Sequence, residues 1–187
     1  MTDTEPPRRR LVEIVKSRSF SAGSDVTLVS GRSSTFYFDM KPTMLDPEGA
    51  HLIATLILDA LAGAEVDLVG GLEMGAVPLA TAVAAASHVR GRPLPAFFVR
   101  KQAKEHGARK LVEGLARGES LAGKRVAVLE DVTTTGGSAA KAIEALKAEG
   151  AIIDRVITVV DRLEGAADNF KAAGIVFTPI LTAADFR

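Results

Sequence analysis

The residues best suited to chemistry follow a short apolar run at residues 126–129, which predicts a buried strand. The run ends in two adjacent acids, Glu130 and Asp131, and a turn rich in hydroxyl groups and glycine follows. Apolar spacing then predicts a helix at 138–149. The residues of the turn are Val132, Thr133, Thr134, Thr135, Gly136, Gly137 and Ser138. Backbone N–H groups, hydroxyls and the positive end of a helix meet at such a turn, so it is suited to bind a phosphate.

The acid pair stands at the end of a predicted strand, so both carboxylates can point into a crevice. Carboxylates in that place can hold sugar hydroxyls, orient a hydrated Mg²⁺ or stabilise a developing positive charge. The alternative is a pair of surface acids that cap the turn. The turn lacks the lysine of the G-x-x-x-x-G-K-[ST] motif, which excludes a P-loop.

A cationic stretch at residues 100–110 directly follows a predicted strand at 96–99. Of its eleven residues five are arginine or lysine and one is acidic, and none forms an apolar face. A solvated run of charge is the usual explanation for such a stretch. Because a turn suited to phosphate accompanies it in a protein without net charge, we expect a mobile loop that folds over a polyanion and excludes water.

Composition limits the classes of protein that this chain can be. Its 187 residues fit one domain, and 23 basic residues balance 23 acidic ones, so no global field suggests nucleic acid or a membrane. The chain has no cysteine, which excludes disulfides, thiolate metal sites and cysteine nucleophiles and fits a cytoplasmic location. The longest uncharged run is too short for a membrane span.

Strand and helix patterns alternate along most of the chain. Asp46, Pro47 and Glu48 predict a helix start, because they supply a capping side chain, a proline at the first position and an acid in the first turn. Predicted strands lie at 66–69, 96–99, 126–130, 152–160 and 175–180, and predicted helices at 75–87, 138–149 and 163–173. The alternation predicts an α/β fold with an open, mostly parallel sheet and helices on both faces. Ligands bind beyond the carboxyl ends of the strands in such sheets.

The opening section predicts a different arrangement. Residues 6–17 have helical spacing, and residues 20–29 and 36–40 alternate as strands, which predicts a small hood or flap. We therefore expect a single domain, residues 1–187, with an N-terminal helix and hood at 1–45 and an α/β core at 46–187. Glycines at 70–75 predict a turn between a strand and a helix, which either brings the backbone close to a ligand or is simply tight.

The acids and the threonine-glycine turn after an apolar strand resemble the diphosphate-sugar signature of the type I phosphoribosyltransferases. Three further segments resemble the orotate-specific members of that family. They are residues 100–107, similar to R-K-x-x-K-x-H-G, residues 30–39, similar to S-G-[RK]-x-S-x-x-[YF]-[FVI], and the Asp161-Arg162 pair. The signature alone would indicate the superfamily, and the added segments narrow it to the orotate phosphoribosyltransferases.

The resemblance implies an activity. It implies transfer of the 5-phosphoribosyl group from 5-phospho-α-D-ribose 1-diphosphate (PRPP) to orotate, which gives orotidine 5′-phosphate and diphosphate in UMP biosynthesis. It also implies Mg²⁺ as cofactor, bound through the diphosphate and ribose near Glu130 and Asp131. A homodimer is implied as well, in which the loop at 100–110 reaches the neighbouring subunit's site.

The resemblance also implies roles for individual residues. Residues 132–138 would bind PRPP, with 133–138 around the 5-phosphate, while Glu130 and Asp131 would hold the ribose hydroxyls. The diphosphate would be bound by Arg100, Lys101, Lys104 and His106, and the turn at Leu72-Glu73-Met74 would line its path. Orotate would be contacted by Thr134 and Arg162 and bordered by Tyr37 and Phe38. The catalytic residues would be Lys101, Lys104, His106 and Asp131.

Two departures from the family pattern and two other functions stay open. Many members carry basic residues where this chain has Val29 and Glu73-Met74, and Lys41 could supply a replacement charge. A phosphoribosyltransferase for a purine or uracil would share the PRPP site, and Arg162 could merely pair with Asp161 or Glu164. A regulator that binds PRPP without catalysis is the second alternative, although the retained cationic loop and the neutral charge disfavour it.

Overall fold

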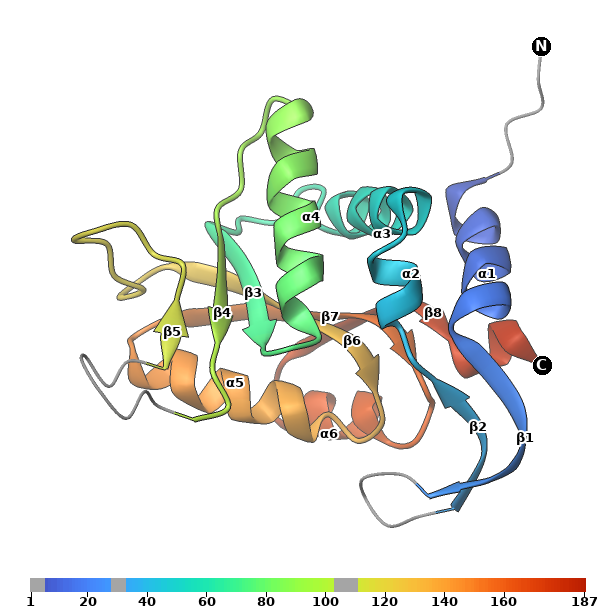
Figure 1. Cartoon of the computed structure of the whole chain (residues 1–187). Helices are drawn as coiled ribbons and strands as arrows, with labels where there is room; N and C mark the ends of the chain where they lie inside the picture. The colour runs from blue at the N-terminus through green and yellow to red at the C-terminus, as the bar shows by residue number, and fades with distance from the viewer. Residues whose placement is uncertain (1–5, 28–32, 103–110) are drawn as a thin grey trace.

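A computed structural model describes residues 6–27, 33–102 and 111–187 of the chain (Figure 1). Its main sheet has six strands in the order β5-β4-β3-β6-β7-β8. Five of them are parallel: β3 (Leu68–Leu72), β4 (Ala96–Val99), β6 (Arg125–Thr133), β7 (Ile152–Asp161) and β8 (Val176–Thr182). The edge strand β5 (Val112–Glu113) is antiparallel and was not predicted. The predicted open, mostly parallel sheet is confirmed.

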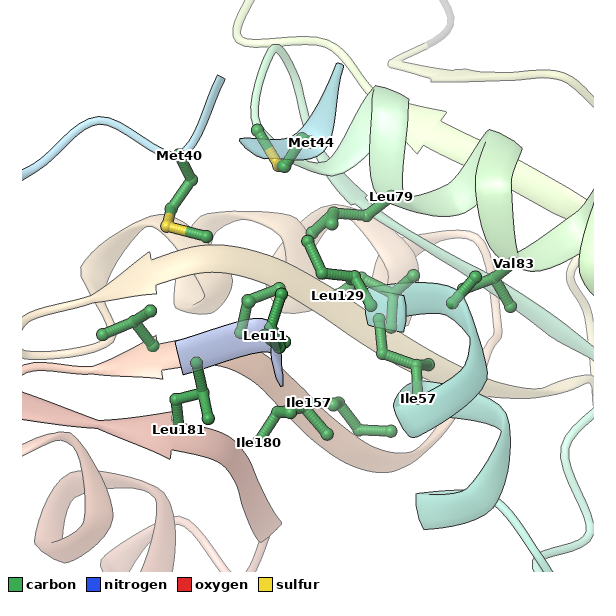
Figure 2. Close-up of a cluster of buried hydrophobic side chains, with 14 of the residues drawn as sticks. Leu11, Met40, Met44, Ile57, Leu79, Val83, Leu129, Ile157, Ile180 and Leu181 are labelled. Atoms are coloured by element: carbon green, nitrogen blue, oxygen red, sulfur yellow. The ribbon is translucent and has the colours of Figure 1, made fainter. Parts of the chain in front are cut away.

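Helices cover both faces of this sheet, as predicted (Figure 1). One face packs against α1 (Pro7–Arg18), α3 (Pro47–Ala60) and α4 (Ala76–Val89), and the other against α5 (Gly137–Ala148) and α6 (Ala166–Ala172). Side chains of β6 alternate between the two cores, so Ala127 and Leu129 face the first and Val126 and Val128 the second. Figure 2 shows the first core around Leu129. The apolar run at 126–129 is thus explained by burial on both sides of one strand.

The N-terminal hood is a separate two-stranded antiparallel sheet of β1 (Phe20–Thr27) and β2 (Ser33–Phe38). Its Phe20 and Phe38 rings pack with Phe186 of the C-terminal 3-10 helix η1 (Ala183–Phe186), at centroid distances of 5.4 and 5.0 Å. A short helix α2 (Lys41–Met44) then leads into α3, whose first turn is capped by Asp46 Oδ2 accepting from Gly49 N at 3.0 Å. No helix in the described ranges is long and apolar enough to cross a membrane.

The amino end of β7 carries an ion-pair network far from the carboxyl ends of the strands. Asp154 accepts hydrogen bonds from Arg125 and, at 2.7 Å, from Arg155, and its side chain is 7% exposed. Burial alone would raise the pKa of Asp154, but the hydrogen bonds from Arg155 and Arg125 outweigh it and hold the pKa below its ordinary value. The ion pairs therefore stabilise the fold above pH ~4, and this contribution is lost as the pH falls through the lowered pKa.

We expect Asp154→Asn to lower the free energy of unfolding by about 1–2 kcal/mol at pH 7, because both arginines lose a charged partner that is only partly shielded from water. Urea denaturation at pH 7, 5 and 3.5 measures this difference, which should persist at pH 5 and narrow below about pH 4. Glu144→Gln, at an exposed position in the middle of α5, is the control. A loss that is the same at all three pH values would contradict the ionic explanation.

Candidate active site

The order of the strands places a switch point between β3 and β6. The chain moves from β3 outward to β4 on one side and later returns to β6 on the other side. In open α/β sheets the loops that follow two such strands diverge, and ligands bind between them at the carboxyl ends of the strands. The two stretches that carry the acids and the glycines meet at this point.

Gly70 and Gly71 lie inside β3, so their prediction as turn residues is wrong. A Cβ on Gly71 would lie 2.1 Å from the Leu129 carbonyl oxygen, and a Cβ on Gly70 would lie 2.2 Å from that of Phe97. These glycines allow β3 to pack closely against its neighbours, and the strand continues to Leu72. Local sequence favours a turn at paired glycines, and tertiary packing decided otherwise.

The turn that follows β3 is shorter than predicted and lies against Asp131. It contains a cis peptide bond between Glu73 and Met74 and ends at Gly75, the N-cap residue that precedes α4. A Cβ on Gly75 would lie 2.5 Å from Asp131 Oδ1, so only glycine lets the carboxylate lie against this turn. The structure thus brings Asp131 together with the Glu73–Gly75 segment, as expected for one crevice.

Glu130 is almost completely buried at the carboxyl end of β6, with 7% of its surface exposed. Its Oε2 atom and the Oγ1 atom of the buried Thr133 have no hydrogen-bond partner among the described residues. Burial, together with the charge of Asp131, raises the pKa of Glu130 to about 9, while Lys101 acts in the opposite direction. Unsatisfied buried polar atoms are rare in native proteins, and a ligand that carries hydroxyl groups would satisfy both.

The predicted phosphate turn has a fixed shape. Gly136 adopts a left-handed conformation with φ +89°, and a Cβ there would lie 2.7 Å from the Phe170 ring. Asn169 Nδ2 of α6 donates to the Thr135 carbonyl oxygen at 2.9 Å. No side chain caps the start of α5, so the first N–H groups of this helix remain available to an anion. Sequence reasoning missed Asn169 and Phe170, because only the fold brings α6 beneath the turn.

The cationic loop starts at the same edge of the sheet. The Lys101 backbone N–H donates to Glu73 Oε1 at 2.9 Å, and the Arg100 N–H donates to the Leu111 carbonyl oxygen at 2.8 Å. Arg100 and Lys101 are therefore held next to the turn that contacts Asp131. Lys104 and His106, which were also predicted as site residues, lie outside the described residues.

Arg162 joins the phosphate turn to the hood. Its backbone N–H donates to the Thr133 carbonyl oxygen at 2.9 Å, and its guanidinium carbon lies 4.6 Å from the centre of the Phe36 ring. The side chain is 3% exposed, and its Nε atom donates to Glu164 Oε1 at 2.8 Å. The ion pair with Glu164, which was the alternative to a binding role for Arg162, therefore exists. The backbone of Arg162 lies at the carboxyl end of the sheet, and the predicted site residue Thr134 is half-buried.

The hood presents Tyr37 and Phe36 to this region in different ways. Tyr37 is 40% exposed, whereas Phe38 is 4% exposed and packs in the aromatic core of the hood. The structure therefore places Phe38 away from an open surface, and Phe36 takes the position beside Arg162. Alternation along β2 puts residues 36 and 38 on one face, so strand periodicity alone could have linked Phe36 to Phe38 but not to Arg162.

Lys41 lies at the end of the hood and is paired with Asp39, at 2.9 Å between Nζ and Oδ1. The hydrogen bond that Lys41 donates to Asp39 raises the pKa of Lys41, and the more distant charge of Asp131 adds to this effect. A positive charge therefore lies near Asp131 although Met74 is apolar and 62% exposed. Val29 lies outside the described residues.

The donor set at this edge suits Mg²⁺ only in part. Within the described ranges no group of three or more histidine, aspartate or glutamate side chains could hold a metal ion. Mg²⁺ usually takes one or two carboxylates and completes its shell with substrate phosphates and water. Asp131 and the unpartnered Oε2 of Glu130 fit that pattern if a phosphorylated sugar supplies the remaining ligands.

Comparison with known proteins gives a consistent result. Residues 43–186 match the phosphoribosyl transferase domain. The orotate phosphoribosyltransferase of Rhodopseudomonas palustris strain TIE-1 is 60% identical over 179 residues, which cover 96% of this chain and 95% of the relative. The crystal structure of Mycobacterium tuberculosis H37Rv orotate phosphoribosyltransferase with Fe(III) dicitrate is 40% identical, with a TM-score of 0.82 over 96% of this chain and 98% of that one.

A second structure of the Mycobacterium tuberculosis enzyme, in complex with PRPP, is 38% identical with a TM-score of 0.78, and it covers 96% of this chain and 98% of that one. The family domain covers the α/β core, whereas the relative and both structures cover 96% of the chain. Their identities are far above those that show a shared fold alone. The chain therefore belongs to the phosphoribosyltransferase family and, within it, to the orotate phosphoribosyltransferases.

Proposed function

We propose that this protein transfers the 5-phosphoribosyl group from PRPP to orotate and releases diphosphate, a reaction that makes orotidine 5′-phosphate for UMP synthesis. One observation carries the proposal. A single backbone hydrogen bond, from Arg162 to Thr133, joins a turn suited to a phosphate to an arginine suited to a carboxylate. PRPP supplies the phosphate and orotate the carboxylate. The relatives that carry the same activity in their names support the choice of base.

The chemistry that this site must perform is the departure of diphosphate from the anomeric carbon of the ribose. Positive charge develops on the sugar and negative charge on the leaving group. Orotate is already an anion, so the site needs no strong general base. Asp131 and Glu130 would stabilise the sugar charge, and Arg100 and Lys101 the leaving group. This is electrostatic preorganisation combined with positioning, which contributes most where donors and charges are fixed in advance.

The start of the cationic loop supports this division of roles. The hydrogen bond from the Lys101 backbone to Glu73 fixes the backbone from which the loop departs. Lys101 acts on the charge of Glu130, so its ammonium group and the acid pair belong to one electrostatic unit. Lys104 and His106 continue the same run of cations in the sequence, and we include both in the proposed diphosphate site.

Mg²⁺ is part of the proposal. When bound with PRPP it would neutralise charge on the diphosphate, and the residues that would hold the complex are Glu130 and Asp131.

The proposal also includes a homodimer that shares the loop at 100–110 and a cytoplasmic location. The lack of cysteine is consistent with a reducing compartment. A purine or uracil enzyme is less well supported, because neither base has a carboxylate for Arg162.

We expect the absorbance of orotate to fall when the protein is mixed with orotate, PRPP and Mg²⁺, and removal of the metal with EDTA to lower the rate at least 100-fold. Spectrophotometry with orotate, uracil and adenine in parallel measures the choice of base. Turnover of adenine or uracil without orotate would replace the proposed substrate. Tight PRPP binding without turnover of any base would instead indicate a regulator.

A further inference from the structure

Arg162 stands in an unusual backbone setting. β7 ends at Asp161, and the next residue but one, Leu163, has φ +61°. It is the one non-glycine residue with positive φ in the parts of the chain that the structure describes. Leucine rarely adopts this conformation, because its Cβ approaches the following carbonyl oxygen. The side chain of Leu163 is also 53% exposed, so hydrophobic packing does not explain the bend.

The bend is held by Asp161. Its Oδ1 atom accepts a hydrogen bond from the Leu163 backbone N–H at 2.9 Å, and the residue is 2% exposed. Such a contact between a side chain and the backbone two residues later is typical of an Asx-turn. Burial raises the pKa of Asp161, and the Leu163 N–H acts against this rise. The buried side chain of Asp161 thus stabilises the strained backbone of Leu163.

The residue between these two partners is Arg162. Its backbone N–H is fixed by the Thr133 carbonyl oxygen, its Nε atom by Glu164 and one face of its guanidinium by the Phe36 ring. Leu163, with its positive φ, stands between Arg162 and Glu164, whose side chains are paired. Rotation about the last bonds of the arginine is therefore restricted before any ligand binds.

We propose that Asp161 and Glu164 are positioning residues, which set the orientation in which Arg162 meets the carboxylate of the base. Asp161 acts through the bend at Leu163, and Glu164 acts through the Nε atom. The inference rests on the proposed function, in which Arg162 binds orotate. It goes further by assigning the recognition of the base to a preformed unit of four consecutive residues, 161–164. When the guanidinium group is held in its binding orientation in advance, less side-chain entropy is lost on binding.

A set of variants at 161 and 163 separates the bend from the charge. Asp161→Asn keeps an oxygen acceptor and should leave the KM for orotate within about twofold of wild type, whereas Asp161→Ala should raise it about tenfold, the effect of one lost hydrogen bond at a charged site. The KM for PRPP should stay unchanged in both. Leu163→Gly in the Asp161→Ala background should restore most of the KM, because glycine adopts positive φ without help. Glu164→Ala should also raise the KM for orotate alone.

The outcomes distinguish this inference from the proposed function. If Arg162→Lys leaves the KM for orotate unchanged, the arginine does not bind the base and the proposed role itself fails. If Arg162→Lys raises that KM while Asp161→Ala and Glu164→Ala do not, the positioning inference is overturned. It is also overturned if Leu163→Gly gives no recovery and Asp161→Asn behaves like Asp161→Ala, because Asp161 then acts through its charge. If Asp161→Ala does not fold, Glu164→Ala and the double variant Asp161→Ala/Leu163→Gly test the inference instead.

Discussion

Replacing Gly136 with alanine should lower the free energy of unfolding by about 2–4 kcal/mol, through the left-handed backbone and overpacking against a ring. Gly136 has φ +89°, and the added Cβ would lie 2.7 Å from the Phe170 ring. The same residue shapes the turn in front of α5. We therefore also expect the KM for PRPP to rise at least tenfold, because the backbone N–H groups that face the phosphate lose their alignment.

Gly137→Ala is the matched control for this prediction. Gly137 follows Gly136 directly, yet a Cβ there would meet only Thr135 Oγ1, at 4.0 Å. Its free energy of unfolding should stay within about 0.5 kcal/mol of wild type. Urea denaturation and steady-state kinetics with varied PRPP measure both variants. Equal stability of the two variants would show that neither the positive φ nor the Phe170 ring constrains the turn.

Sequence reasoning could reach Gly136 because turn chemistry is local. A strand, two acids, hydroxyl residues and glycines before a helix have a meaning that depends on neighbours along the chain. Helix α3 was predictable for the same reason, since Asp46 and Pro47 mark its start. The strand β4 was predicted with its observed bounds, at 96–99, because its short apolar run stands between polar segments.

The remaining features depend on contacts between distant parts of the chain. Strand β5 has only two residues and no periodicity that a pattern could reveal. Asn169 and Phe170 support the phosphate turn from a helix about thirty residues later, and the hydrogen bond between Glu73 and Lys101 spans two loops. Glu73 seemed a departure that removes a basic contact, and the structure shows that its carboxylate anchors the cationic loop. Residue type alone could not give this role, because it depends on how close β3 lies to β4.

The hood illustrates the same limit within a single strand. Alternation along β2 correctly separates Tyr37 from its two phenylalanine neighbours, but it does not say which ring meets Arg162. Phe38 packs toward Phe186 near the C-terminus, and Phe36 lies nearer to the carboxyl end of β7. Which ring meets Arg162 thus depends on contacts between the hood, the C-terminal 3-10 helix and the end of β7, which exist only in the assembled fold.

The buried acid of the site has a cost in stability, and Glu130→Gln should reveal it. In the substrate-free protein the pKa of Glu130 is raised to about 9 by burial and by Asp131, from an ordinary value of 4.5. Between these values the folded protein keeps a proton that the unfolded chain has released, so stability falls as the pH rises. The glutamine variant has no such group. The free energy of unfolding of Glu130→Gln should therefore exceed that of the wild type by a margin that grows by about 1 kcal/mol per pH unit between pH 5.5 and 8.5.

The same substitution should lower kcat/KM at least 100-fold. Positive charge that develops on the sugar favours the ionised form of Glu130, whereas an amide can never carry the negative charge that stabilises it. Urea denaturation without ligands at pH 5.5, 7 and 8.5 measures the first effect, and the orotate assay measures the second. Glu144→Gln, on the exposed face of α5, is the control that should change neither. A wild-type stability that does not fall with pH, or a variant that is stabilised but fully active, would contradict the assignment. If Glu130 served packing, replacing it would lower the stability of the protein. A variant that gains stability and loses activity is therefore expected only if Glu130 is buried at this position for the reaction.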